Sequence, residues 1–143
     1  MINNDLVLAK ISSIDRCLKR IETTTQGDPK TLKNFDIQDV FVLNLQRAIQ
    51  ISIDLASHLV SAHNLGVPKT LRESFELLER AHLIEPALAK KLTKMVGFRN
   101  IAIHEYQLIN EEILESIFTE RLIDLKEFIA AVSLMISKNR QGG

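Results

Sequence analysis

The spacing of apolar residues is the feature that most limits what this chain can fold into. Between residues 6 and 22, apolar side chains recur at intervals of four and three, at Val7, Ile11, Ile14, Leu18 and Ile21. This spacing places all of them in one stripe on an α-helix. No segment alternates apolar and polar residues as a half-buried β-strand does. The pattern therefore predicts an all-α fold.

Breaks between the periodic segments divide the chain into helices. Gly27 and Pro29 interrupt the first helix. A long second helix is expected over about residues 36–64, with the Asp36 side chain capping its first turn. Polar residues gather on one side of this helix, and the rest of its circumference is mostly Ile, Leu and Val. It is therefore expected to be the central helix of the fold.

Three more helices are expected in the second half of the chain. A capping box at residues 70–73 opens a short helix that ends near His82. Pro86 suits the first turn of a helix over residues 86–104. Asn110 is expected to cap a last long helix, and the tail over residues 138–143 is expected to fray. The whole pattern predicts an antiparallel bundle of four long helices plus one shorter helix.

Composition narrows the class of protein further. The chain has 143 residues, of which 45% are apolar and 25% charged, as expected for a single globular domain over residues 1–143. Its single cysteine, Cys17, excludes an internal disulfide, fits a reducing compartment, and is expected to be an inert, half-buried thiol. We find neither a signal peptide nor an apolar stretch that approaches about 18 residues, so a cytoplasmic location is predicted.

The local distribution of charge is more informative than the total. Lysine plus arginine equals aspartate plus glutamate at 18 each, so the whole chain offers no net attraction to nucleic acid. Between residues 86 and 104, however, there is no acid, and the basic residues are Lys90, Lys91, Lys94 and Arg99. Residues 111–127 contain six acids. The basic helix either pairs with this acidic segment or faces a phosphate, and the pattern leaves both possibilities open.

Residues 97–106, "GFRNIAIHEY", hold polar side chains that a helical core does not require. Asn100 and His104 are four residues apart and share one face of a helix. Arg99 lies about 140° around the helix from His104, so one straight helix does not bring the two side chains together. Either the helix unwinds near His104, or a second copy of the chain supplies the missing partner across a two-fold axis.

These residue types suit the chemistry of phosphate esters. A neutral imidazole can take a proton from a ribose 2′-hydroxyl and return one to the leaving 5′-oxygen. An arginine fork can neutralise the charge that develops on the phosphate, and Asn100 can orient the histidine or a phosphate oxygen. Such a reaction needs no metal. The spacing alone also fits a helix-end histidine and a surface arginine with no catalytic role.

The stretch "FRNIAIHEY" resembles the signature of the HEPN superfamily, and most closely the Arg-x4-His-x-Tyr motif of HepT-type toxins. Arg99, Asn100, His104 and Tyr106 each match that motif, and the resemblance covers nearly the whole chain. It implies a metal-independent endoribonuclease toxin that works as a homodimer with the two motifs facing each other. It also implies a nucleotidyltransferase antitoxin that uses ATP as cosubstrate and transfers AMP to Tyr106. No cofactor of the chain itself is expected.

Two further sets of residues are candidates for supporting roles. Gln50 and Asp54 lie one turn apart on the second helix, where they either line the pocket beside His104 or belong to a solvated face. Lys90, Lys91 and Lys94 are expected to hold RNA electrostatically, because no platform of aromatic residues is visible.

The sequence also bears on metal binding and on two functions other than RNA cleavage. His58, His63 and His82 lack the spacing of metal ligands, so no metal site is predicted. One alternative is an inert HEPN module that docks a nucleotidyltransferase, and another is a plain helical interaction bundle. The presence of both Arg99 and His104 favours the nuclease over the inert module.

Overall fold

A computed structural model describes residues 2–104 and 111–142, and residues 100–104 and 139–142 as backbone only. Every regular element in these ranges is helical, which confirms the all-α prediction. A short 3₁₀ turn (Pro29–Lys33) links the first two helices. The helices are α1 (Asn4–Thr25), α2 (Phe35–Ala62), α3 (Glu73–Arg80), α4 (Pro86–His104), α5 (Glu111–Ser116) and α6 (Leu122–Gly142). The first, second and fourth periodic segments thus became α1, α2 and α4 close to the expected bounds.

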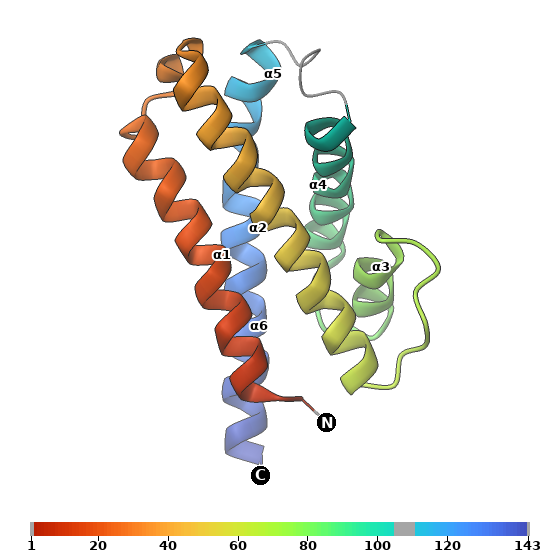
Figure 1. The fold of residues 1–143 in the computed structure, drawn as a ribbon. Helices are drawn as coiled ribbons and strands as arrows, with labels where there is room; N and C mark the ends of the chain where they lie inside the picture. Colours follow the sequence, from red (N-terminus) through yellow and green to blue (C-terminus); the bar gives the residue numbers. More distant parts are fainter. Residues whose placement is uncertain (1, 105–110, 143) are drawn as a thin grey trace.

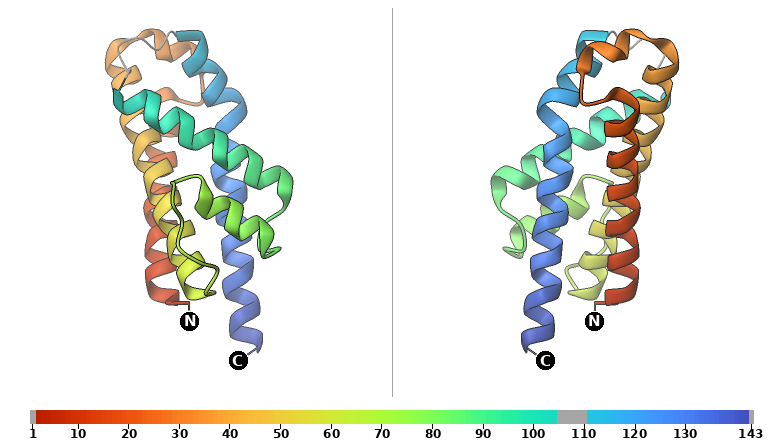
Figure 2. Two further views of the ribbon diagram at one scale, coloured as in Figure 1. Left: turned by 90° about the vertical axis from the view of Figure 1, so that its right-hand side faces the viewer. Right: turned by 90° about the vertical axis from the view of Figure 1, so that its left-hand side faces the viewer.

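The four long helices run alternately up and down (Figure 1). The two ends of the chain lie at one end of the bundle, and the C-terminal end of α4 and the start of α5 lie at the other. The short helix α3 lies beside α4, and α4 crosses the bundle obliquely (Figure 2). This arrangement brings the basic motif segment to the end of the bundle that is remote from the two termini.

The core is a continuous set of buried apolar side chains from all the long helices. The predicted stripe of α1 is buried along its whole length, with Val7 and Ile14 fully enclosed. The ring of Phe75 on α3 meets the ring of Phe128 on α6 edge-on, with centroids 5.5 Å apart. This contact fixes the short helix against the bundle. None of the helices described is long and apolar enough to cross a membrane.

The start of α2 differs from the prediction. The Asn34 side chain accepts hydrogen bonds from the backbone N–H groups of Asp36 (2.9 Å) and Ile37 (3.2 Å), so Asn34 is the cap and the prediction of Asp36 was wrong. Asn34 has the extended backbone (φ −80°, ψ 124°) that a capping residue adopts. Asp36 lies within the first turn, where its charge favours the positive end of the helix dipole.

The capping box at residues 70–73 is formed, but the helix begins later than predicted. The Thr70 hydroxyl accepts a hydrogen bond from the Glu73 N–H at 3.2 Å. The Glu73 carboxylate accepts from the Lys69 N–H, also at 3.2 Å, one residue before the expected donor. Helix α3 ends at Arg80, because His82 adopts a positive φ of 60° that no α-helix allows.

The last predicted helix is divided by a turn of π-helix at Ile117–Arg121. A π turn holds more residues than an α turn, so it shifts the apolar stripe around the helix axis. Ile117 and Phe128 are buried, whereas Phe118 and Ile129 are only partly buried. Asn110, the predicted cap, lies outside the described residues. Helix α6 continues to Gly142, through the tail that was expected to fray.

Cys17 is buried in α1, at 9% exposure. Burial raises the pKa of its thiol, and the positive charges of Arg47 and Arg16 oppose that shift in part. A raised pKa keeps the thiol protonated and unreactive, which agrees with the prediction of an inert cysteine.

Candidate functional site

Arg99 is held in place by helix α2. It lies four residues after the buried Met95 on α4, so its side chain continues the apolar stripe and enters the space between α4 and α2. Its Nε–H donates a hydrogen bond of 2.7 Å to Oε1 of Gln50, and both side chains are partly buried. Because the donor is a guanidinium, this bond is charge-assisted and stronger than a neutral one. The orientation of the guanidinium is therefore set by α2.

Asp54 in turn orients Gln50. Nε2 of Gln50 donates a hydrogen bond of 3.0 Å to Oδ1 of Asp54, one turn further along α2. An ionised carboxylate only accepts hydrogen bonds, so the Gln50 amide must turn its NH₂ group to Asp54. Its oxygen then faces Arg99. The sequence left open whether Gln50 and Asp54 line a pocket beside His104 or belong to a solvated face. The structure places them in a relay that ends on Arg99.

The rest of the motif is described only in part. The side chains of Asn100 and His104 and the whole of Tyr106 lie outside the described residues. The backbone of α4 is helical as far as His104. The helix therefore does not unwind before the histidine, and its geometry keeps Arg99 about 140° away from His104.

Of the three lysines of α4, one forms an ion pair with α6 and two are exposed on the side of the helix away from Arg99. Nζ of Lys91 lies 3.7 Å from Oε2 of Glu127 on α6, with both side chains about 40% exposed. Lys91 therefore follows the alternative in which the basic helix pairs with the acidic one. Lys90 and Lys94 are exposed on the side of α4 about 140–180° around the helix from Arg99. They do not converge on Arg99.

A second arginine near the motif was missed in the sequence. A Cβ atom added to Gly97 would lie 3.4 Å from Nη2 of Arg72, so this guanidinium lies against α4 two residues before Arg99. Arg72 sits in the turn before α3, where no periodic pattern singles it out. The absence of a side chain at Gly97 was the only signal in the sequence that something approaches the helix there.

One of the six acids in residues 111–127 is buried. Asp124 on α6 is 1% exposed, and its Oδ2 atom lies 3.7 Å from Nη1 of Arg121 and has no hydrogen-bond partner among the described residues. Burial raises the pKa of this carboxyl, and the charges of Arg121 and Lys91 offset part of the shift. Asp124 therefore costs stability when it is ionised.

No group of three or more histidine, cysteine, aspartate or glutamate side chains in the described part of the chain is arranged to hold a metal ion. His58 instead accepts a hydrogen bond of 3.3 Å from the Asn3 N–H, and so ties the start of α1 to α2.

An antiparallel helical bundle that carries Arg-x4-His at the end of α4 defines a protein of the HEPN class. More specifically, the chain belongs to the HepT-like family, described as "Ribonuclease HepT-like". The model of this family matches residues 14–132. The resemblance seen in residues 98–106 is therefore confirmed at the level of the family.

Three known proteins show how far the similarity extends. The chain is 40% identical to the mRNA nuclease HepT of Shewanella oneidensis over 129 residues, which cover 90% of this chain and 97% of that protein. It is 32% identical to the tRNA nuclease HepT of Aphanizomenon flos-aquae over 93 residues, 65% of this chain and 62% of that one. Its fold superposes on the tri-AMPylated HEPN toxin of Shewanella oneidensis in complex with MNT antitoxin, with a TM-score of 0.85, 40% identity, and coverage of 93% of this chain and 99% of that one.

Proposed function

We propose that this protein is an endoribonuclease toxin that cleaves RNA without a metal ion and is silenced by AMP transfer to Tyr106. The observation that carries the proposal is the arginine of the motif, held by Gln50 and Asp54 before any substrate arrives. A donor fixed in advance stabilises developing charge without a cost of reorganisation. Membership of a ribonuclease family and the presence of Arg99, Asn100 and His104 support the same function.

The proposed reaction is an internal transfer at phosphorus. An imidazole nitrogen of His104 takes the proton of a ribose 2′-hydroxyl, and the 2′-oxygen attacks the adjacent phosphorus. The bond from phosphorus to the 5′-oxygen breaks, and that oxygen receives a proton from the imidazolium. The products are a 2′,3′-cyclic phosphate and a 5′-hydroxyl. Arg99 neutralises the negative charge on the phosphate oxygens in the transition state, and Asn100 orients the imidazole or a phosphate oxygen.

We propose that the active form is a homodimer whose two motifs face each other. The support is the angular offset between Arg99 and His104 on a helix that stays regular as far as the histidine. A two-fold axis close to the ends of the two α4 helices would bring Arg99 of one protomer near His104 of the other. A monomer by light scattering at micromolar concentration would contradict this assembly.

Two partners act on the toxin in this proposal. RNA is the substrate, and Lys90 and Lys94 raise its local concentration at the motif, together with Lys91 when that residue leaves Glu127. The second partner is a nucleotidyltransferase antitoxin. In the reaction that silences the toxin, the Tyr106 oxygen attacks the α-phosphorus of ATP, the phenol loses its proton, and pyrophosphate leaves. The added phosphate and adenosine compete with RNA for Arg99 and block the site. A relative has been observed as a tri-AMPylated toxin in complex with MNT antitoxin.

The catalytic proposal is tested with purified protein and a labelled RNA. Arg99→Ala and His104→Ala should each abolish cleavage and leave the thermal unfolding midpoint within a few degrees, while Arg80→Ala, an exposed arginine on α3, serves as the matched control. Wild-type cleavage should persist in a chelator and leave cyclic phosphate ends. Loss of cleavage with chelator, or 5′-phosphate ends, would refute the mechanism. A wild-type protein that binds the antitoxin but cleaves no RNA would instead support the inert docking module.

Silencing is tested by intact mass after incubation with the antitoxin and ATP. Wild-type protein should gain mass in steps of one AMP, whereas Tyr106→Phe should gain none and should stay toxic in the presence of the antitoxin. Modification at another residue, or no change in mass, would end the claim.

A further inference from the structure

A basic groove runs between α1 and α2, on the side of α2 away from α4. Its volume is about 370 Å³, and three of its lining residues are arginines: Arg16 and Arg20 from α1, and Arg47 from α2. No acidic residue lines it. The chain as a whole has no net charge, so this concentration of positive charge is a local feature. No motif or spacing in the sequence distinguishes these three arginines from other surface residues.

The arginines of the groove are not neutralised by their own helices. The positions three and four residues before and after each of them hold no acid, and Arg16 and Arg20 are themselves one turn apart, where like charges repel. The two ion pairs found among the described residues involve other side chains. The repulsion between Arg16 and Arg20 does not favour the fold, and a negatively charged ligand would relieve it.

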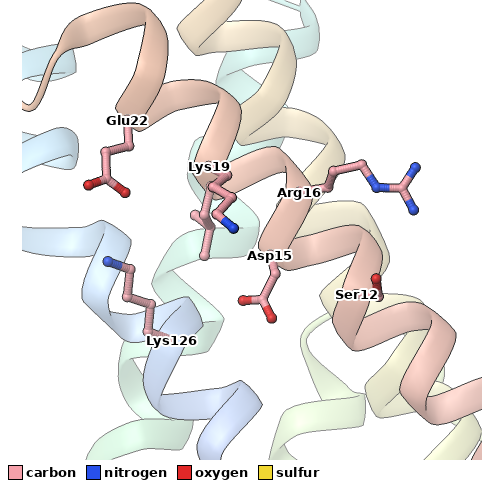
Figure 3. A pocket seen from close by; sticks show the side chains of 7 residues that line it. Ser12, Asp15, Arg16, Lys19, Glu22 and Lys126 are labelled. Atoms are coloured by element: carbon pink, nitrogen blue, oxygen red, sulfur yellow. The ribbon is translucent and has the colours of Figure 1, made fainter.

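The neighbouring hollow between α1 and α6 shows the contrast. It is lined by two acids, Asp15 and Glu22, and by three basic residues, Arg16, Lys19 and Lys126, so acids match most of its positive charge. Figure 3 shows the two carboxylates on one side of α1, while the Arg16 side chain points away from both of them. Arg16 lines both this hollow and the basic groove, and its guanidinium lies on the side of α1 away from the two carboxylates.

Part of the lining of the groove is apolar. Val40, Leu43 and Ile51 of α2 line it, and Leu43 is 44% exposed. An arginine fork matches the oxygens of a phosphate in pairs, and its planar face stacks on a nucleobase. Apolar side chains beside it accept the faces of sugars and bases. This combination fits single-stranded nucleic acid, which presents phosphate and base faces alternately.

The groove lies within one helical turn of the residue that holds Arg99. Arg47 precedes Gln50 by three residues on α2, a rise of about 4.5 Å, and Gln50 holds Arg99. Arg47 is exposed, and helix geometry places it about 60° around α2 from Gln50, so Arg47 is the member of the groove on the same helix as the residue that holds Arg99.

We propose that Arg16, Arg20 and Arg47 form a binding site for the phosphate backbone of the single-stranded RNA substrate, extending from the site at Arg99. This inference rests on the proposed ribonuclease function. It names a surface on α1 and α2 that positions RNA and takes no part in the proton transfers. An acidic segment of a protein partner is the competing occupant. RNA is favoured because Arg47 lies within one helical turn of Gln50, which holds the arginine of the proposed cleavage site.

The test measures binding separately from cleavage. A labelled, unstructured RNA oligonucleotide is titrated with the His104→Ala protein at several salt concentrations. The same background then carries Arg16→Gln, Arg20→Gln and Arg47→Gln together. The matched control is Lys30→Gln, Lys33→Gln and Lys69→Gln, which removes three exposed positive charges outside the groove. Unfolding midpoints check that all the proteins are folded.

For three phosphate contacts on a single strand, the logarithm of the binding constant falls with the logarithm of the salt concentration with a slope of about 2. At 0.15 M salt these contacts make binding about 50-fold tighter than at about 1 M salt. The arginine variant should lose both, and the lysine control should lose little, because charges beyond about 8 Å are screened. With wild-type His104, the arginine variant should show its loss in KM more than in kcat. Equal behaviour of the two variants would overturn the proposal, as would intact RNA binding with loss of antitoxin binding or of dimer formation.

Failure of the two proposals can be told apart. Arginine-dependent RNA binding by a wild-type protein that cleaves no RNA would support the groove and refute the ribonuclease. If instead the wild type and the triple arginine variant cleave RNA with the same KM and the same salt slope, the proposed groove is refuted and the ribonuclease function still stands.

Discussion

The relay from Asp54 through Gln50 to Arg99 predicts that a residue with no chemistry of its own controls the rate of cleavage. Gln50→Leu removes the acceptor of the 2.7 Å bond from Arg99 Nε and keeps nearly the same volume. A hydrogen bond to a charged group contributes about 1.5–3 kcal/mol, and the lower half of that range applies to a partly buried pair. If orienting Arg99 without this bond costs that free energy in the transition state but not in the bound RNA complex, kcat falls about ten- to fortyfold.

Single-turnover cleavage over a range of enzyme concentrations separates this effect from RNA binding. We expect the loss in the rate at saturation, with the apparent affinity for RNA changed much less, because Gln50 positions Arg99 and does not itself bind the substrate. Asp54→Asn tests the next hydrogen bond of the relay and should have a smaller effect. It keeps an acceptor near Gln50 but no longer forces the orientation of the amide, so a loss of only a few fold is expected. An unchanged rate for Gln50→Leu, or a loss confined to affinity, would refute the reasoning.

Two more outcomes follow from the geometry. When Arg99→Ala and His104→Ala protomers are mixed, cleavage should return in the mixed dimers, each of which then contains one complete site; an inactive mixture would mean that both residues come from one chain. Asp124→Asn should stabilise the fold at pH 7 by about 1 kcal/mol, or about 3 °C in unfolding midpoint, because it removes a buried charge while Arg121 can still reach solvent. The pKa of Asp124 is raised in the folded state, so its contribution to stability is complete below the unfolded pKa of about 3.8 and is lost as pH rises through the folded pKa. The gain from Asp124→Asn should therefore disappear in acid, and a gain that is the same at pH 3 and pH 7 would contradict this account.

Periodicity predicted the bundle because the apolar stripes of α1, α2 and α4 are long and regular. Val7, Ile14 and Ile21 are buried as the spacing indicated. The π-helical turn before α6 was not predicted, because one additional residue in a turn changes the spacing of apolar residues too little to be noticed. The cap of α2 was misplaced by two residues, since Asn34 and Asp36 are both good capping residues and only the backbone angles distinguish them.

The sequence could single out candidate residues of the site, but it could not show which of their atoms are in contact. The motif singled out Arg99, and the one-turn spacing of Gln50 and Asp54 on an otherwise apolar helix was a usable signal. Which of their atoms meet depends on how α4 crosses α2, and no spacing within one helix contains that information. The same limit applies to Arg72 and to the basic groove, whose members come from different helices and converge only in the folded chain.

The balance of 18 positive and 18 negative side chains conceals an uneven distribution in the fold. Acids of α6 are matched locally, Glu127 by Lys91 and Asp124 by Arg121. On α1, Asp15 and Glu22 share their hollow with two lysines and with Arg16, whose guanidinium points away from them. These arrangements leave the positive charge of Arg16, Arg20 and Arg47 concentrated on the surface between α1 and α2. Total charge governs the field only at distances beyond about 8 Å, where salt screens it in any case. A phosphate within a few ångströms of α2 experiences the local arrangement, so a chain without net charge can still hold RNA beside Arg99.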